Sequence, residues 1–439
     1  MEFDVERVAG WIDSLVKRPE DIADLFVETR RSVVTELSDG EVVAVRAQDE
    51  EGLSARLASA GRESLAFVSS ASESGAREAV RSLQRALGRP PLPVKPDRGD
   101  ENEEPGDLEV ERWNKRLPAL LARIAPRHRL RWSLTETARR VIPARAPAAA
   151  SLRRLFSIEG TLIAASRRGD EVRAFNFHAP DAESTGEEVR AALHRAQQPR
   201  DAPAPCGDGE TAVVLAGGCA ALFFHEILSH PLEAGQESPL SGLEQARVSV
   251  PELDVRDDPL RLDLFGGYER DDEGTRPRGV KLLDGGRVAG RLTDRAHGAR
   301  PPSNGHARRA GPGDLPLPRG ANVVVASGHA TTDEMARRLS SGLWIEELDG
   351  GSIELASGRF RLKFPRARRV RRGRLADECG PGLLAGDILS ALKAIDGGLG
   401  RDVHVYRALG FCARSGQIVP VQGAAPDVLV RRLAVRSLT

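Results

Sequence analysis

The segment Cys219-Ala-Ala-Leu-Phe-Phe-His-Glu-Ile-Leu-Ser-His230 is almost wholly apolar, yet it carries two histidines and one glutamate. An apolar helix has no solvated face for polar groups, so His225, Glu226 and His230 must find partners inside the protein. A metal ion is one partner that satisfies two imidazoles at once. The alternative is a pair of buried histidines that are hydrogen-bonded within an ordinary core.

The order His-Glu-x-x-x-His is one residue longer than the zinc peptidase pattern His-Glu-x-x-His, in which histidines one turn apart bind zinc and the glutamate is the general base. On a regular α-helix, positions i and i+5 point about 140° apart, so a straight helix cannot aim both imidazoles at one ion. Either a bend at Pro231 or a π-bulge would bring them together. The spacing leaves both possibilities open.

Length and charge bound the class of protein. The chain has 439 residues, enough for two or three domains. Its 64 basic and 64 acidic residues cancel, so no overall field attracts nucleic acid or an anionic membrane. The N-terminus lacks a signal-peptide pattern, and no apolar run reaches the ~18 residues of a membrane span. We therefore expect a cytoplasmic protein that binds neither nucleic acid nor membranes directly.

Four cysteines are too few and too scattered for a disulfide scaffold, and their number is compatible with a reducing compartment. We expect three of them, Cys206, Cys219 and Cys379, to be ordinary buried thiols. Taken alone, Cys412 is also most simply a small buried apolar residue.

The first part of the chain predicts a mixed α/β domain over residues 1–205. Turn residues between β-branched runs predict β-hairpins in 22–68, followed by an amphipathic helix over 72–87. The Pro-rich, charged stretch 89–106 predicts a mobile loop. Further predicted elements are helices over 108–124 and 184–196 and strands within 130–177.

The second part, residues 206–439, predicts a β-rich domain. Strand 211–216 leads into the histidine helix, and short strands follow almost to the end of the chain. One further helix is predicted over 381–395. We expect an antiparallel, barrel-like domain that carries the histidine helix, and an α+β class for the whole chain.

Several motifs then occur in a characteristic order: His225-Glu-Ile-Leu-Ser-His-Pro-Leu-Glu233, Leu264-Phe-Gly-Gly-Tyr-Glu-Arg-Asp-Asp-Glu-Gly274, Gly290-Arg-Leu-Thr-Asp-Arg295, Pro302-Ser-Asn-Gly305 and Phe411-Cys-Ala-Arg-Ser-Gly-Gln417. Together they resemble the TldD/PmbA family of zinc metallopeptidases. The similarity covers most of 211–435, and the hairpins of 22–68 resemble the family's N-terminal domain.

The resemblance implies one zinc ion per chain, held by His225, His230 and Cys412. Two imidazoles and one thiolate leave a fourth tetrahedral position for water. Glu226 then matches the general base that takes the proton of this water, and the implied activity is hydrolysis of peptides or unstructured polypeptide segments.

The family also implies a homodimer or a heterodimer with a TldE/PmbA-like paralogue. Its non-catalytic members provide the alternative function, a peptide-binding or regulatory subunit of the gyrase-modulator type with a structural zinc ion. Glu226 argues against this alternative, because a structural site needs no base and usually has four protein ligands.

Other candidate residues have two interpretations each. Ser303, Asn304 and Gly305 either contact an extended peptide or form a tight turn. Asp271, Asp272 and Glu273 lack the spacing of an EF-hand, which favours a solvated turn over a calcium site. His297 and His306 either line the cleft or have surface or structural roles. The basic run Arg366–Arg374 is better explained as a solvated β-hairpin than as a nucleic-acid patch.

Overall fold

The structure is a computed structural model that describes residues 3–89, 109–146, 150–165, 172–181, 183–197, 204–297 and 302–438. All but the first residue of the loop predicted at 89–106 lies outside these ranges. Among the described residues, no helix combines the length and the apolar content that crossing a bilayer requires.

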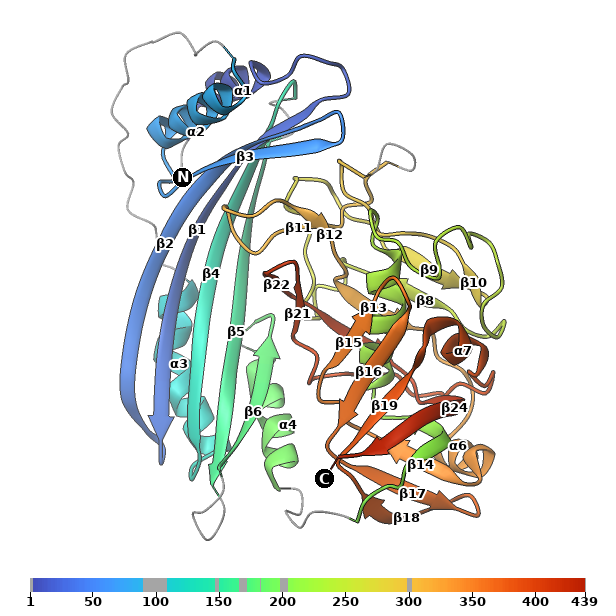
Figure 1. Cartoon of the computed structure of the whole chain (residues 1–439). Coiled ribbons are helices and arrows are strands. Elements are labelled where there is room, and N and C mark those ends of the chain that lie inside the picture. Colours follow the sequence, from blue (N-terminus) through green and yellow to red (C-terminus); the bar gives the residue numbers. More distant parts are fainter. Residues whose placement is uncertain are drawn as a thin grey trace.

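The N-terminal half is built on one long antiparallel sheet with the strand order β3-β2-β1-β4-β5-β6 (Figure 1). Its strands are β1 Ile22–Ser38, β2 Glu41–Ser59, β3 Arg62–Val68, β4 Arg129–Pro143, β5 Ser151–Ala165 and β6 Val172–Ala179. The turn predicted between β1 and β2 is confirmed, because Ser38 pairs with Glu41 across Asp39 and Gly40, which both have positive φ. Strands of 17 and 19 residues replace the shorter ones that the sequence predicts.

Helices cover one face of this sheet. α1 Val5–Asp13 and α2 Glu73–Ala86 pack near one end, and α3 Glu109–Ile124 and α4 Thr185–Gln197 pack further along (Figure 1). In β1, Leu25 and Val27 contact the first helix pair, and Val33 and Leu37 contact the second. All four are odd positions of one strand, so their side chains share one face of the sheet. The side chains at even positions point to the opposite face, toward the C-terminal half.

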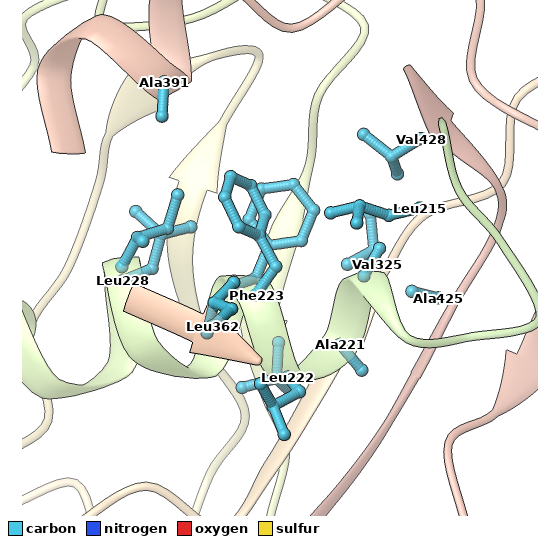
Figure 2. Close-up of a cluster of buried hydrophobic side chains, with 14 of the residues drawn as sticks. Leu215, Ala221, Leu222, Phe223, Leu228, Val325, Leu362, Ala391, Ala425 and Val428 are labelled. Atoms are coloured by element: carbon cyan, nitrogen blue, oxygen red, sulfur yellow. The ribbon is translucent and has the colours of Figure 1, made fainter. Parts of the chain in front are cut away.

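Two sheets in the C-terminal half enclose the apolar helix α5, Ala220–Phe224. The orders are β15-β16-β19-β24-β7-β14-β17-β18 and β10-β9-β8-β13-β23-β20. Figure 2 shows Phe223 among Leu215, Val325 and Leu362, which come from strands of both sheets. The expected α+β class is confirmed, with a β-rich C-terminal half that carries the histidine helix.

The strands of the larger sheet are β7 Gly209–Leu215, β14 Gly342–Ile345, β15 Gly351–Glu354, β16 Arg359–Phe364, β17 Ala367–Arg371, β18 Arg374–Cys379, β19 Gly382–Asp387 and β24 Val428–Ser437. Those of the smaller sheet are β8 Val255–Asp257, β9 Val280–Asp284, β10 Arg287–Val288, β13 Asn322–Val325, β20 His404–Val405 and β23 Gln422–Ala425. Two hairpins stand apart: β11 Ala307–Arg308 with β12 Leu317–Pro318, and β21 Phe411–Arg414 with β22 Gln417–Pro420. The remaining helices are α6 Thr332–Leu339 and α7 Ile388–Lys393.

Most neighbouring strands are antiparallel, as expected, but β7 with β14 and β13 with β23 are parallel pairs. The helix predicted over 381–395 is wrong in its first half, which forms β19 between β16 and β24. Gly382 and Gly386 lie against the rings of Phe364 and Phe360, so this stretch is held by packing that its own pattern does not show. The helix itself begins only after Asp387, whose side chain caps it.

A disulfide joins Cys206 to Cys379, 173 residues apart. The expectation that these two are ordinary thiols is therefore wrong. The chain leaving the N-terminal half forms a bridge from Ala204 to Cys379, which brings Cys206 alongside β18. Cys219 is a free, buried thiol as expected. The division of the chain at residue 205 stays a prediction.

Candidate metal centre

The histidine helix contains one widened turn. α5 ends at Phe224, residues His225–Ser229 form a π-helical turn, and His230–Leu232 continue as a 3₁₀ turn. The backbone N–H of His230 donates to the carbonyl oxygen of His225, five residues earlier. Of the two devices that the spacing left open, the π-turn therefore aligns the histidines, and Pro231 follows inside the 3₁₀ turn.

Three buried side chains converge at this turn. The rings of His225 and His230 lie 4.8 Å apart between centroids, and Sγ of Cys412, from β21, lies 3.3 Å from Nε2 of His230. One ligand atom from each residue lies within 4.8 Å of the others. A tetrahedral zinc ion with bonds of about 2.0–2.3 Å places its ligand atoms about 3.3–3.8 Å apart. The three side chains are thus close to the spacing of one metal site.

The electrostatics of the cluster suit a cation. Burial raises the pKa of the Cys412 thiol, but the neighbouring imidazoles of His225 and His230 outweigh it and lower this pKa to about 4. Burial lowers the pKa of His230, whereas the carboxylate of Glu233 raises it well above its usual range. The Cys412 thiolate and the Glu233 carboxylate thus lie on two sides of the His230 ring, and their negative charges favour a positive charge at this place.

The donor atoms also fit a metal. Both ring nitrogens of His225 are buried, and neither has a hydrogen-bond partner in the described part of the protein. An unpaired buried polar group costs about 1–3 kcal/mol, so it is rarely left without compensation. A bound metal ion would satisfy one of these nitrogens. The set of two imidazoles and one thiolate is a known ligand combination for zinc.

Glu226 lies on the π-turn directly after His225 and is partly buried. Its side chain packs toward β15, where a Cβ on Gly351 would lie only 2.9 Å from Cγ of Glu226. β15 is one of the two edge strands of the larger sheet, and its neighbour there is β16. The predicted base therefore follows His225 on the π-turn and packs against this strand edge.

The segment Ser303–Gly305 is a tightly bonded turn. The Asn304 amide is engaged on both sides, since it accepts from Thr293 N and donates to the Arg291 carbonyl. Gly305 has φ +79° and lies so close to Pro277 that a Cβ would meet its Cα at 2.5 Å. These contacts favour the turn interpretation, and substrate binding by Ser303, Asn304 and Gly305 stays a prediction.

Two other candidate histidines have structural partners. His306 is fully buried, with Nδ1 2.8 Å from Oδ1 of Asn304 and Nε2 3.2 Å from Oδ1 of Asp257. His297 lies 2.9 Å from Oδ1 of Asp294 through Nδ1. The structural alternative therefore accounts for both.

The expectation of a solvated turn at Asp271, Asp272 and Glu273 is wrong, because all three side chains are buried. Asp271 accepts backbone N–H bonds within its loop, Asp272 pairs with Arg139 of β4, and Glu273 pairs with Arg56 of β2. The three acidic residues thus join the loop before β9 to the face of the N-terminal sheet that the helices leave uncovered. By contrast, the basic run Arg366–Arg374 forms the expected hairpin, β17–β18, with ion pairs to Asp377 and Glu378.

His178, near the end of β6, connects the N-terminal sheet to the hairpin that carries Cys412. Its ring lies 5.3 Å from that of Phe265 and 5.0 Å from that of Phe411. Burial, with a smaller effect of Arg195, lowers the pKa of His178 from 6.5 to about 4. A proton therefore binds the unfolded chain more readily, and folding stability falls as pH drops from 6.5 toward 4.

We expect the burial of His178 to lower the free energy of unfolding by roughly 2 kcal/mol when the pH falls from 7 to 4.5. In His178→Gln the difference between these two pH values shrinks, whereas the exposed His329→Gln keeps the wild-type difference. Urea unfolding of the three proteins at both pH values measures it. The same pH dependence in His178→Gln and wild type would contradict the prediction.

A cleft of about 900 Å³ lies between the N-terminal sheet and the hairpin β21–β22. Its lining includes Phe411, Tyr268 and Arg308 from the C-terminal half and the even face of β1. Phe411 and Cys412 are consecutive strand residues and point to opposite sides. The cleft therefore borders the hairpin on the face opposite the thiol.

Sequence reasoning overlooked two residues that touch the converging side chains. Glu233 contacts His230, and Arg319 contacts Cys412. Glu233 ends the first of the quoted motifs, and this position could have indicated a role in the site. No pattern near Arg319 in the sequence indicates that it contacts Cys412.

Comparison with known proteins agrees with this picture. Residues 208–437 match the model of the PmbA/TldA metallopeptidase C-terminal domain. A metalloprotease of Methanothermobacter thermautotrophicus is 30% identical over 239 residues, which are 53% of this chain and 51% of that protein. The zinc metalloprotease TldD homolog of Saccharolobus solfataricus is 27% identical over 237 residues, 52% of each chain. The chain thus spans about half the length of the curated relatives it matches.

Two solved structures have the same fold. TldE from Thermococcus kodakarensis superposes with a TM-score of 0.71 at 15% identity and covers 99% of both chains. A Thermotoga maritima protein described as a candidate modulator of a DNA gyrase gives 0.67 at 16% identity, with 98% of this chain and 100% of that chain covered.

The region that matches this family model holds all three converging side chains. The chain belongs to the PmbA/TldD family.

Proposed function

We propose that this protein is a zinc-dependent metallopeptidase that hydrolyses peptides or unstructured polypeptide segments. The observation that carries the proposal is the convergence of His225, His230 and Cys412 across the π-turn, with both nitrogens of His225 lacking a hydrogen-bond partner among the described residues. The names of the relatives, metalloprotease and zinc metalloprotease, support the same activity class.

In this proposal His225, His230 and Cys412 hold one zinc ion, which supplies a Lewis acid and an acidified water when bound. Glu226, on the turn between the two histidines, takes the proton of the attacking water and delivers it to the leaving amine. Its partial exposure leaves it accessible to solvent and substrate, unlike the three buried ligands.

The neighbouring edge of β15 supports an extended peptide as the substrate. An exposed strand edge offers unpaired backbone N–H and C=O groups, so a peptide in β conformation can pair with it independently of its side chains. Because Gly351 has no side chain, Glu226 packs directly against this edge. A homodimer, or a heterodimer with a TldE-like paralogue, and a cytoplasmic location remain parts of the proposal that rest on the sequence resemblance and composition.

The test combines zinc analysis with cleavage of an unstructured peptide. We expect wild type to carry about one zinc per chain and to cleave the peptide, with activity lost on chelation and restored by Zn²⁺. Glu226→Gln keeps the side-chain volume, so it should retain zinc and lose cleavage by at least about a hundredfold. Glu237→Gln, which changes a carboxylate outside the site, is the matched control.

Zinc-free wild type that stays zinc-free after addition of Zn²⁺ would contradict the proposal. Zinc-loaded protein without cleavage, in wild type and Glu226→Gln alike, would instead favour the non-catalytic subunit. If the active form is a heterodimer, co-expression with a TldE-like paralogue precedes this comparison.

A further inference from the structure

Behind the three proposed ligands lies a second group of charged side chains to which the proposed mechanism gives no role. It consists of Glu233, Arg319 and Arg414. Glu233 ends the 3₁₀ turn after His230, Arg319 follows β12, and Arg414 lies on β21 two residues after Cys412. Three separate segments thus meet behind one side of the site.

Glu233 is the centre of this group and is fully buried. Its carboxylate lies 3.4 Å from Nδ1 of His230 and accepts the backbone N–H of Gly320 at 3.2 Å. It also pairs with the guanidinium of Arg414, and Nε of Arg319 lies 3.9 Å away. A buried carboxylate is costly unless paired, and here cations and donors approach it from three segments.

The contact with His230 fixes the chemistry of that imidazole. A carboxylate beside Nδ1 accepts the N–H hydrogen bond of this nitrogen, so in the neutral imidazole the lone pair lies on Nε2. Nε2 is the atom that lies 3.3 Å from Cys412 Sγ, on the side where the ligands converge. Glu233 therefore holds His230 in the tautomer and orientation that a metal needs.

Arg319 acts on the other ligand. It is fully buried, and its Nη2 donates to the carbonyl oxygen of Cys412 at 2.7 Å and to Sγ at 3.1 Å. Its Nε and Nη1 make no hydrogen bond in the described structure, so its strongest contacts are those with Cys412. A charge-assisted N–H···S contact draws electron density from a thiolate and fixes its direction.

We propose that Glu233 and Arg319, braced by Arg414, are positioning residues of the metal centre: Glu233 orients His230 and Arg319 orients Cys412. The inference rests on the proposed function, because it takes zinc to be the bound group. Within the described ranges His225 receives no such support, since neither of its ring nitrogens has a hydrogen-bond partner there. Two of the three ligands are thus held in place by the protein before a metal arrives.

The experiment measures metal binding rather than turnover. The Zn²⁺ affinity of wild type, Glu233→Gln and Arg319→Leu is determined by competition with a chromophoric chelator at one fixed pH. Loss of such outer partners typically lowers metal affinity about ten- to hundredfold, and we expect this for both variants. Co²⁺ substitution adds a specific readout, because the thiolate-to-cobalt charge-transfer band reports on the Cys412 sulfur and should shift in Arg319→Leu but not in Glu233→Gln.

Arg56→Met is the matched control, since it removes an equally buried guanidinium far from Cys412 in the sequence and outside this group. It is expected to destabilise the fold and to leave Zn²⁺ affinity unchanged. If Arg319→Leu does not fold, Arg414→Gln tests the same group at a partly exposed position, with a smaller loss of affinity expected.

The possible outcomes separate the two proposals. Wild type without Zn²⁺ binding overturns the proposed function and this inference with it. Wild type that binds Zn²⁺, together with folded Glu233→Gln and Arg319→Leu of unchanged affinity and unchanged Co²⁺ spectrum, overturns the positioning role alone. Reduced affinity with the band shift confined to Arg319→Leu supports it.

Discussion

His225→Ala and Cys412→Ser are each expected to lower bound zinc from about one ion per chain to nearly none. The proposed site has three protein ligands, so losing one leaves only two, and zinc sites in proteins rarely hold with fewer than three. The serine hydroxyl is a poor substitute because it is not ionised at neutral pH and lacks the soft sulfur that zinc favours. Elemental analysis of desalted protein gives the stoichiometry directly.

The chain provides close controls for both changes. Cys219 is the other free buried cysteine, and its Sγ donates to the Ile345 carbonyl rather than to the cluster. His306 is an equally buried histidine with partners of its own. Cys219→Ser and His306→Gln should therefore keep their zinc. Full zinc content in Cys412→Ser would show that the ligand set is misassigned.

The second large effect is expected on stability, at the junction between the N-terminal sheet and the loop before β9. Arg56 is fully buried and pairs with Asp24 at 2.6 Å, with Glu63 and with Glu273. Removal of one partner from a buried ion pair leaves an uncompensated charge, which typically costs about 3–5 kcal/mol. We expect Arg56→Met to lose this amount of unfolding free energy in urea denaturation.

An exposed ion pair provides the control for this prediction. Arg432 and Glu210 form an ion pair with both side chains largely exposed. Such pairs contribute about 0–1 kcal/mol, so Arg432→Met should change little. Equal losses in the two variants would mean that the buried cluster adds no more than a solvated pair.

The local parts of the fold follow from the sequence because their causes are local. The turn at Asp39-Gly40 and the helices over 73–86, 109–124 and 185–197 depend on turn residues and apolar spacing within a few positions. The strand β19 depends on the Phe360 and Phe364 rings of a neighbouring strand, which cannot be read from residues 381–387. Tertiary packing there overrides a helical pattern.

The candidate site divides in the same way. His225, Glu226 and His230 stand out because polar side chains interrupt an apolar run, whereas Cys412 is recognised only through the family resemblance. Glu273 shows the limit most clearly. Its acidic, Gly-rich surroundings favour a solvated turn, and only the fold brings Arg56 to it from more than 200 residues away. Burial of a charge depends on its partner, and partners distant in sequence leave no local pattern.

The π-turn at His225–Ser229 has an evolutionary implication. A helix widened by a single residue differs from a regular one by one inserted amino acid, and the strain of the insertion stays within that turn. Deleting one residue between Glu226 and His230 would restore the four-residue spacing, and a regular turn would again place both imidazoles on one side. The five-residue and four-residue motifs are thus two lengths of chain that bring two imidazoles to the same side, and a search for candidate metal sites by fixed spacing alone misses the longer one.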